Sequence, residues 1–318
     1  MIYPIALPDR LELLVSIGDE QRQFTAAIPE TALCGEVQHF RELLEKRTTN
    51  EYLAPARQLY DQLIRPMEAV LAAHHIDTLV IVPDYTLRTI PFAALHDGNG
   101  FLVDRYATAI APGMHLTDPT PLSSAPGTAL VLGVSKSVQG YVELPNVETE
   151  VAAMHQIEGG QELLNDDFSR ARFEAELRRV PYNVVNIASH GQFGNDRSDT
   201  FVLAFDGQLA MDDLERSIKF GERRDKALEL LILSACETAS GDDRAALGLA
   251  GVALKAGARS ALATLWYISD KAAGELIVDF YRGVQSGTLS KAHALQCAQR
   301  ALAADPAMRT RPTGRRFC

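Results

Sequence analysis

The sequence predicts an α/β fold built on a mostly parallel sheet with helices on both faces. Short apolar runs alternate with segments whose apolar residues recur at helical spacing, and this alternation continues through the second half of the chain. The clearest runs are 182–189 and 228–233, each followed abruptly by small or polar residues. A nearly continuous apolar run of this length is typical of a strand buried on both faces of a parallel sheet.

The composition is that of an ordinary globular protein, with 318 residues, 47% hydrophobic and 23% charged. This length allows one large domain or two modest ones. A net charge of −10 argues against a general nucleic-acid binder. The four cysteines lie far apart without CxxC spacing, which favours reduced thiols over a disulfide framework or a metal site.

The N-terminal residues lack the basic and apolar blocks of a signal peptide. No run approaches the roughly 18 apolar residues that a membrane-spanning helix needs. We therefore expect a soluble cytoplasmic protein that does not bind membranes and uses neither a metal nor a cofactor.

The first half of the chain predicts a sheet with helices. Two β-rich runs at 11–17 and 23–28 flank Gly18-Asp19-Glu20 and are typical of a hairpin. Apolar residues at helical spacing follow at 33–44 and at 59–71, the second stripe being broken near Pro66. Residues 79–82 are then typical of a buried strand, and residues 101–110 are expected to be extended.

A stretch rich in proline and small polar residues, 117–127, is the best candidate for a domain boundary. We expect an N-terminal part at 1–120, a C-terminal part at 121–304 and an irregular basic tail at 305–318. Beyond the boundary, strands and helices alternate, in the order strand 129–134, helices 147–157 and 168–180, strand 182–189, strand 201–205, helix 212–218, strand 228–233, helix 245–256, strand 260–265, and helices from 272 and from 289.

Two of these strands deliver reactive side chains where they end. His190 follows the run 182–189, and Cys236 follows the run 228–233. Ligands and catalytic groups gather at the carboxyl ends of strands in open α/β sheets. A free thiol titrates near pH 8.5 and attacks an amide usefully when a base such as histidine helps to form the thiolate. The pair is therefore a candidate catalytic dyad.

Three stretches together resemble a CHAT domain, a family of caspase-like and separase-like cysteine proteases of clan CD. They are IASHG at 187–191, LILSACETASGD at 231–242 and the run at 257–266. The run LVIVPDYTLRTIPFAAL at 79–95 resembles the family's first half, so the resemblance covers nearly the whole chain. It implies a caspase-like sheet with a degenerate N-terminal half and an active C-terminal half.

The resemblance implies a role for each candidate residue. His190 and Cys236 are similar to the catalytic histidine and the nucleophile, with the histidine upstream as in caspases. The backbone N–H groups of Gly191 and Cys236 are then the oxyanion donors. Asp270 lies in a segment similar to the specificity segment of separase, where it would favour Arg or Lys, or it caps the following helix as an ordinary N-cap. Asp242 is a weaker candidate for substrate contact.

The expected function is cleavage of a protein substrate in a regulated bacterial pathway, through a thioester formed on Cys236. Two alternatives stay open. One is a catalytically silent CHAT-fold module that binds a partner protein. The other is a flavodoxin-like small-ligand binder, for which Gly133-Val134-Ser135-Lys136-Ser137 is a faint phosphate-loop signal.

The sequence departs from the family in two respects. No tetratricopeptide-type repeats are present in the 318 residues, so recognition of a target or activator is expected either to be lost or to be supplied by a separate regulatory or repeat-containing partner. The residues 305–318 are basic and broken by proline and glycine, unlike the strand with which family members tend to finish. An exposed sheet edge with lower stability or partner association is the expected consequence.

Overall fold

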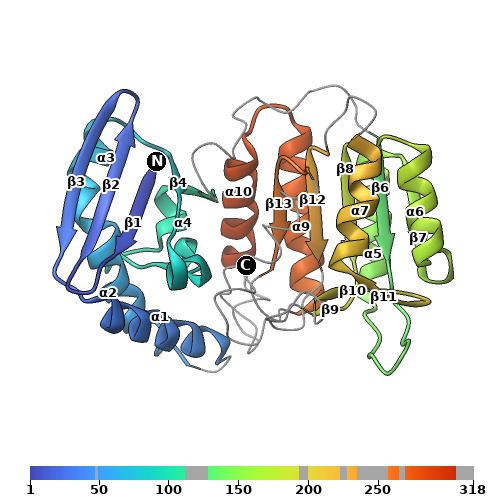
Figure 1. The fold of residues 1–318 in the computed structure, drawn as a ribbon, viewed down its shortest axis with the longest axis horizontal. Coiled ribbons are helices and arrows are strands. Elements are labelled where there is room, and N and C mark those ends of the chain that lie inside the picture. The colour runs from blue at the N-terminus through green and yellow to red at the C-terminus, as the bar shows by residue number, and fades with distance from the viewer. Residues whose placement is uncertain are drawn as a thin grey trace. The chain divides into compact units, whose positions relative to one another are not determined.

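The computed structural model describes residues 1–46, 49–111, 128–192, 200–222, 228–234, 257–264 and 269–305. These residues form two compact units (Figure 1). The first combines the described residues of Met1–Thr117 with those of Leu289–Phe317, and the second comprises those of Asp118–Thr288. The division into 1–120, 121–304 and 305–318 stays a prediction.

The first unit contains a five-stranded sheet in the order β3-β2-β1-β4-β5. Strands β2 and β3 form the predicted hairpin, with Leu11 opposite Ala26 and Ile17 opposite Glu20. Gly18 lies in its turn with a φ of 55°, a left-handed conformation that glycine adopts without steric cost. The strands are β1 (Ile2–Ala6), β2 (Leu11–Ile17), β3 (Glu20–Ala26), β4 (Thr78–Ile81) and β5 (Ala107–Ile110).

Strand β1 was not predicted, and it contains Pro4, a residue that is uncommon inside sheets. It lies between β2 and β4, with Pro4 opposite Leu13 of β2. The pairing of β1 with β4 is short and joins Ile2 to Ile81. The pairing of β1 with β4 does not include Pro4, so the missing N–H of this proline costs no hydrogen bond in that ladder.

The helices of the first unit follow the predicted apolar stripes, and the second stripe is interrupted at Pro66 as expected. The stretch 101–110 is not wholly extended, since residues 102–105 form a short helix whose first turn is held by a hydrogen bond from Phe101 N to Asp104 Oδ2. The elements are α1 (Glu30–Glu45), α2 (Leu53–Leu63), η1 (Arg65–Met67), α3 (Glu68–Ala73), η2 (Tyr85–Thr89), η3 (Phe92–Ala94), α4 (Leu102–Arg105) and α10 (Lys291–Ala304).

Helix α10 belongs to the first unit although it lies far along the chain. It packs against β5 and α4. The side-chain amide of Gln296 is buried and donates to the carbonyl oxygen of Val103 at 2.8 Å. Ser290 caps the helix by accepting a hydrogen bond from His293 N.

The second unit is organised around an all-parallel five-stranded sheet in the order β13-β12-β8-β6-β7. This confirms the predicted α/β class with a parallel sheet. The strands are β6 (Ala129–Gly133), β7 (Gln161–Leu164), β8 (Val184–Ala188), β12 (Leu230–Ser234) and β13 (Ala261–Ala263). The predicted helix 245–256 lies outside the described residues.

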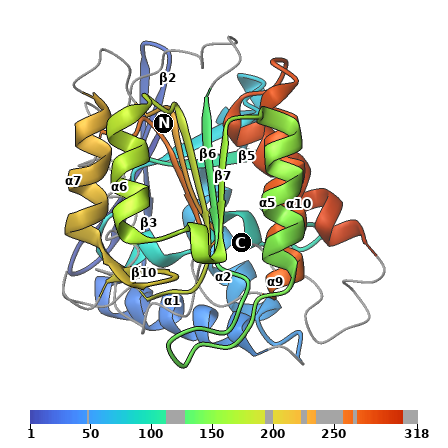
Figure 2. The same cartoon turned by 90° about the vertical axis from the view of Figure 1, so that its right-hand side faces the viewer.

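Helices cover both faces of this sheet, with α5 and α9 on one side and α6 and α7 on the other (Figure 2). Their bounds are α5 (Asn146–Glu158), α6 (Arg170–Arg179), α7 (Met211–Glu222) and α9 (Asp270–Gln285), with the short η4 (Asn165–Asp167) after β7. A small antiparallel sheet is formed by β9 (Gly191–Gln192), β10 (Phe201–Ala204) and β11 (Gly207–Ala210).

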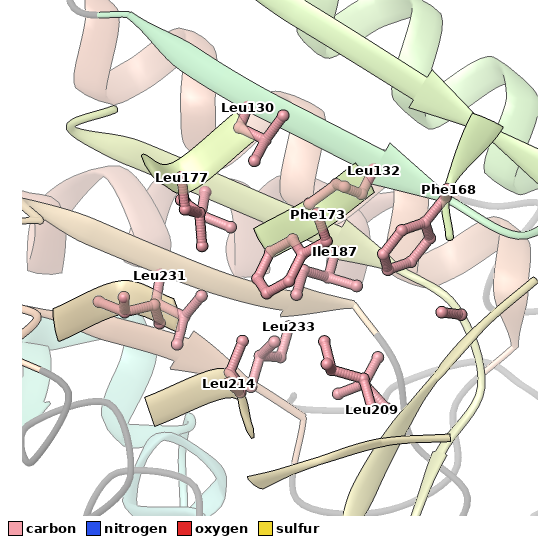
Figure 3. Close-up of a cluster of buried hydrophobic side chains, with 14 of the residues drawn as sticks. Leu130, Leu132, Phe168, Phe173, Leu177, Ile187, Leu209, Leu214, Leu231 and Leu233 are labelled. Carbon is pink, nitrogen blue, oxygen red and sulfur yellow. The ribbon is translucent and has the colours of Figure 1, made fainter. Parts of the chain in front are cut away.

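The main core of the second unit lies between the sheet and the α6/α7 layer (Figure 3). Side chains alternate between the faces of a strand, so odd-numbered residues of β8 and β12 enter this core. Even-numbered residues, including Asn186 and Ser234, then face the α5/α9 layer. The labelled core residues are Leu130, Leu132, Phe168, Phe173, Leu177, Ile187, Leu209, Leu214, Leu231 and Leu233.

Candidate active site

The two strands that precede the candidate dyad are direct neighbours. Strands β8 and β12 pair in parallel, with Ala188 opposite Ser234. His190 follows Ala188 by two residues, and Cys236 follows Ser234 by two. The candidate residues therefore hold equivalent positions after neighbouring strands. Cys236 and Asp242 themselves lie outside the described residues.

His190 is buried, with 9% of its surface exposed. Its Nε2 lies 2.8 Å from the carbonyl oxygen of Val142. Its backbone oxygen accepts a hydrogen bond from Leu203 N at 2.8 Å. The neighbouring Ser189 hydroxyl donates to Leu203 O at 2.6 Å. Strand β10 thus holds the backbone of this segment, and Val142 holds the ring.

The ring of His190 also contacts an aromatic side chain. The ring centroids of Tyr141 and His190 are 5.0 Å apart, with an interplanar angle of 36°. Tyr141 in turn meets Phe201 edge-on at 6.5 Å. The carbonyl of Val142 can only accept a hydrogen bond, so the Nε2 of His190 carries the proton. In neutral His190 the basic nitrogen is then Nδ1.

Tyr141 and Val142 lie in the loop of residues 134–145, here called the β6–α5 loop. A bridge joins Val138 to Tyr141, and the turn between them has positive φ values at Gln139 and Gly140, 52° and 86°. This combination is typical of a tight hairpin turn of the primed type. The Val142 side chain is 69% exposed. The loop therefore presents its carbonyl to His190 and an apolar side chain to solvent.

Asn165, at the end of β7, anchors the start of this loop. Its Oδ1 accepts hydrogen bonds from Ser135 N at 2.8 Å and Lys136 N at 3.1 Å. The Ser135 hydroxyl donates to Glu148 Oε1 at 2.7 Å. The backbone amides that a phosphate-binding loop would offer to a ligand are thus occupied by a side chain. This arrangement speaks against the flavodoxin-like alternative.

Gly133 has a packing role rather than a ligand-binding one. A Cβ atom at this position would lie 2.7 Å from side-chain methyl carbons of both Val147 and Val151. Helix α5 approaches β6 this closely because glycine has no side chain. The glycine that suggested a phosphate loop is therefore explained by the contact between a strand and a helix.

Gly191, the expected oxyanion donor beside Cys236, is the first residue of β9. It is buried, and the antiparallel register places it opposite Val202 of β10. This pairing holds the backbone of Gly191, the residue immediately after His190. Its role as a donor stays a prediction.

Asp270 is not the N-cap of its own helix, as had been one expectation. Ser269 is the N-cap, and its hydroxyl accepts a hydrogen bond from Ala272 N at 3.1 Å. Asp270 is the first residue of α9, and its Oδ2 accepts from both the backbone N and the side-chain Nδ2 of Asn146, each at 2.8 Å. Asn146 begins α5, so Asp270 caps a neighbouring helix.

Glu150 is a buried carboxyl group that the sequence reasoning missed. It lies on α5 and is 2% exposed. Its Oε2 accepts from the Ser234 hydroxyl at 3.0 Å, and its Oε1 lies 3.4 Å from Asn186 Nδ2. Burial raises the pKa of the Glu150 carboxyl to about 7, and the charge of Asp270 acts in the same direction. A signal was available, because Glu150 falls on the apolar stripe of α5 formed by Val147, Val151 and Met154.

Among the described residues, no group of three or more His, Cys, Asp or Glu side chains could hold a metal ion. Within the same parts of the chain, no helix is both long and apolar enough to cross a membrane.

The sequence matches the CHAT domain family model over residues 53–313. No curated protein matches the sequence. The family model covers most of the 318-residue chain, and it spans the parallel sheet, His190 and Cys236. The family includes caspase-like cysteine peptidases, and the parallel sheet flanked by helices is consistent with that fold. The chain belongs to the CHAT domain family.

Proposed function

We propose that the chain is a cysteine endopeptidase that cleaves a protein substrate through Cys236 and His190. The observation that carries the proposal is the register of β8 and β12, in which Ala188 lies opposite Ser234. Adjacent strands lie about 4.8 Å apart. Two residues beyond this pair along the chain are His190 and Cys236, so neighbouring strands lead directly to both members of the proposed dyad.

The hydrogen bonding of His190 supports its role as the base. Since Nε2 donates to Val142 O, the lone pair of Nδ1 is available to accept the thiol proton of Cys236. The thiolate sulfur then forms a bond to the scissile carbonyl carbon, and the carbonyl oxygen becomes an oxyanion. The backbone N–H groups of Gly191 and Cys236 are the proposed donors to this oxyanion.

The remaining steps return the enzyme to its starting state. The C–N bond breaks as protonated His190 gives its Nδ1 proton to the departing amine, which leaves a thioester on Cys236. His190 then takes a proton from water, the hydroxide attacks the thioester carbonyl, and the C–S bond breaks. The new carboxyl terminus leaves, and the sulfur of Cys236 takes the proton back from His190, which restores the thiol and the neutral imidazole.

The substrate residue before the cut is proposed to be Arg or Lys, bound through Asp270. Asp270 has a structural task as well, since its Oδ2 already accepts two hydrogen bonds from Asn146. Asp242 is proposed as a second acidic contact. A separate regulatory or repeat-containing protein is the proposed partner for target recognition.

The proposal is tested by intact-mass labelling with peptide acyloxymethyl ketones that differ in their last residue. We expect one adduct that is lost in Cys236→Ala and strongly reduced in His190→Ala. Cys297→Ala is the matched control, because Cys297 is an exposed free thiol and its removal should leave the adduct intact. Circular dichroism confirms that each variant is folded.

Two results would count against the peptidase. An adduct that survives in Cys236→Ala would assign the reaction to another thiol. A folded wild-type protein that reacts with no ketone would instead favour the catalytically silent module, and binding of partner proteins would then be measured.

A further inference from the structure

A buried carboxyl group connects the two strands that precede the candidate dyad. Glu150 projects from α5 onto the face of the sheet formed by the even-numbered residues of β8 and β12. It meets Asn186 of β8 and Ser234 of β12, and these contacts join the two strands through one side chain. Burial alone would favour an apolar residue at position 150, as it does at Val147, Val151 and Met154 on the same face of α5. A buried glutamate therefore calls for a polar role.

The contacts lie close to the ends of both strands. Ser234 is the last residue of β12 and precedes Cys236 by two positions, and Asn186 precedes His190 by four. In the parallel ladder, Asn186 lies opposite Ile232 and Ser234 lies opposite Ala188. The carboxyl group therefore spans the two strands diagonally, directly before the chain continues to the candidate catalytic residues.

We propose that Glu150 is a positioning residue that holds the carboxyl ends of β8 and β12 in register, and so sets the reactivity of Cys236 toward its base. This proposal rests on the proposed peptidase function. Glu150 acts through Ser234 and Asn186 and does not touch the substrate.

The surroundings of Glu150 favour a group that carries a proton. The Oδ1 atom of Asn186 is buried and accepts no hydrogen bond within the part of the chain that the structure describes. An amide can present either end to its neighbour, so a protonated Glu150 can donate to Asn186 and still accept from Ser234. The charged group that faces Glu150 is Asp270 of α9, whereas β8 and β12 present neutral side chains.

The protonated and ionised forms of Glu150 have different consequences. The protonated form satisfies both strands and adds no charge near the thiol. The ionised form leaves Asn186 Oδ1 without a donor and places a negative charge close to Ser234. This charge would oppose formation of a thiolate at Cys236, two residues further along the chain. The reactivity of Cys236 is therefore coupled to the proton on Glu150.

Glutamine and alanine at position 150 separate these effects. Glu150→Gln resembles the protonated acid, because its oxygen accepts from Ser234 and its amide donates to Asn186. Glu150→Ala removes both contacts. Leu163→Val is a matched control for core destabilisation, since Leu163 is fully buried on β7 at the opposite edge of the sheet from β12 and β13.

The experiment measures labelling by a reactive acyloxymethyl ketone from pH 5.5 to 8.5, with the maximal rate and the half-saturating concentration determined separately. We expect Glu150→Ala to lower the maximal rate about 10-fold to 100-fold with little change in half-saturation, as for a misplaced reacting group. Glu150→Gln should stay near the wild-type rate at low pH and lose the change in rate near pH 7. Leu163→Val should behave as wild type.

Equal labelling of Glu150→Ala and wild type would overturn the proposal. So would a Glu150→Gln variant as impaired as Glu150→Ala, because the shared hydrogen bonds would then be irrelevant. If Glu150→Ala does not fold, Ser234→Ala replaces it, and wild-type labelling kinetics in that variant would equally overturn the proposal.

Failure of the peptidase assignment is distinguishable from failure of this proposal. If the wild-type protein reacts with no ketone, the peptidase assignment fails first. Peptide-resolved alkylation of Cys236 by iodoacetamide, which needs no substrate recognition, then tests the coupling directly. A lower thiol pKa in Glu150→Gln than in wild type supports the coupling, and identical thiol titrations contradict it.

Discussion

The carbonyl oxygen of Val142 accepts a hydrogen bond from Nε2 of His190 across 2.8 Å, and this contact sets the tautomer of the imidazole. Val142 belongs to the β6–α5 loop, whereas His190 follows β8. A connecting loop thus determines which nitrogen of a strand-end histidine is basic.

The first prediction concerns this tautomer. Long-range ¹H–¹⁵N correlation spectra of His190 should show a neutral ring protonated at Nε2, with Nδ1 in the unprotonated state, because a carbonyl cannot donate. His190→Gln identifies the signal by its absence. A ring protonated at Nδ1 would contradict the hydrogen bond and remove the proposed basic nitrogen.

The second prediction concerns Asn165, which has a positive φ of 52° and anchors the β6–α5 loop. Asn165→Ala should lower the free energy of unfolding by about 2 kcal/mol or more, since two backbone donors lose their acceptor and alanine disfavours this φ. Asn165→Gly should cost less than Asn165→Ala, because glycine adopts this φ without strain although both donors still lose their acceptor. Asn165→Asp should cost least, because it keeps an oxygen acceptor for both donors. Urea unfolding measures the order, and an Asn165→Ala variant as stable as wild type would contradict it.

The third prediction compares two glycines. Gly133→Ala should destabilise the second unit by about 1–3 kcal/mol, because the new methyl group would overlap Val147 and Val151. Gly35→Ala is the control, since Gly35 lies in α1 with nothing within 4 Å of the added Cβ. Alanine there should stabilise by up to about 1 kcal/mol. Thermal unfolding of both variants measures the contrast, and similar shifts would refute the close packing of α5 on β6.

The fourth prediction separates the two tasks of Asp270. Asp270→Ala should destabilise the protein by about 1 kcal/mol, because the backbone N–H of Asn146 loses its acceptor at the start of α5. Asp270→Asn keeps an oxygen there and should be closer to wild type. If Asp270 also binds substrate, Asp270→Asn should lose a preference for Arg or Lys ketones while it stays folded. An unchanged preference would leave Asp270 with the structural task alone.

The fifth prediction follows from the raised pKa of Glu150, about 7 in the folded protein against an ordinary value of 4.5. The folded state binds more protons than the unfolded state between these values. The carboxyl's contribution to stability is therefore fully present below pH 4.5 and is lost as the pH rises through about 7, by about 3 kcal/mol. The unfolding free energy of wild type relative to Glu150→Gln should fall over this range, and a constant difference would contradict the shift.

The strands around the candidate site could be predicted because their signal is local. The runs 182–189 and 228–233 are apolar enough to be buried on both faces, and β8 and β12 occupy them. The order of the strands and their register come from tertiary packing. The pairing of His190 with Cys236 was expected from the resemblance and stays a prediction, because Cys236 lies outside the described residues. The structure shows that the strands preceding them, β8 and β12, pair in parallel.

Other features were beyond a local reading. The partner of Asp270 lies 124 residues earlier, at Asn146, so neither residue's neighbours in sequence indicate the contact. Glu150 falls on the apolar stripe of α5, which was a local signal of burial, but its contacts with β8 and β12 depend on how α5 packs on the sheet. Strand β1 contains Pro4, and the general rule against proline in strands does not apply where the pairing with β4 is as short as it is here.

The position of α10 has a consequence for the order in which the protein is completed during synthesis. Residues 291–304 supply the helix that packs on β5 and the amide that satisfies Val103. All described strands of the second unit are synthesised before these residues. The first unit therefore lacks helix α10 until the end of synthesis, although its other described elements are made first. During synthesis the second unit can fold while the first unit is still incomplete.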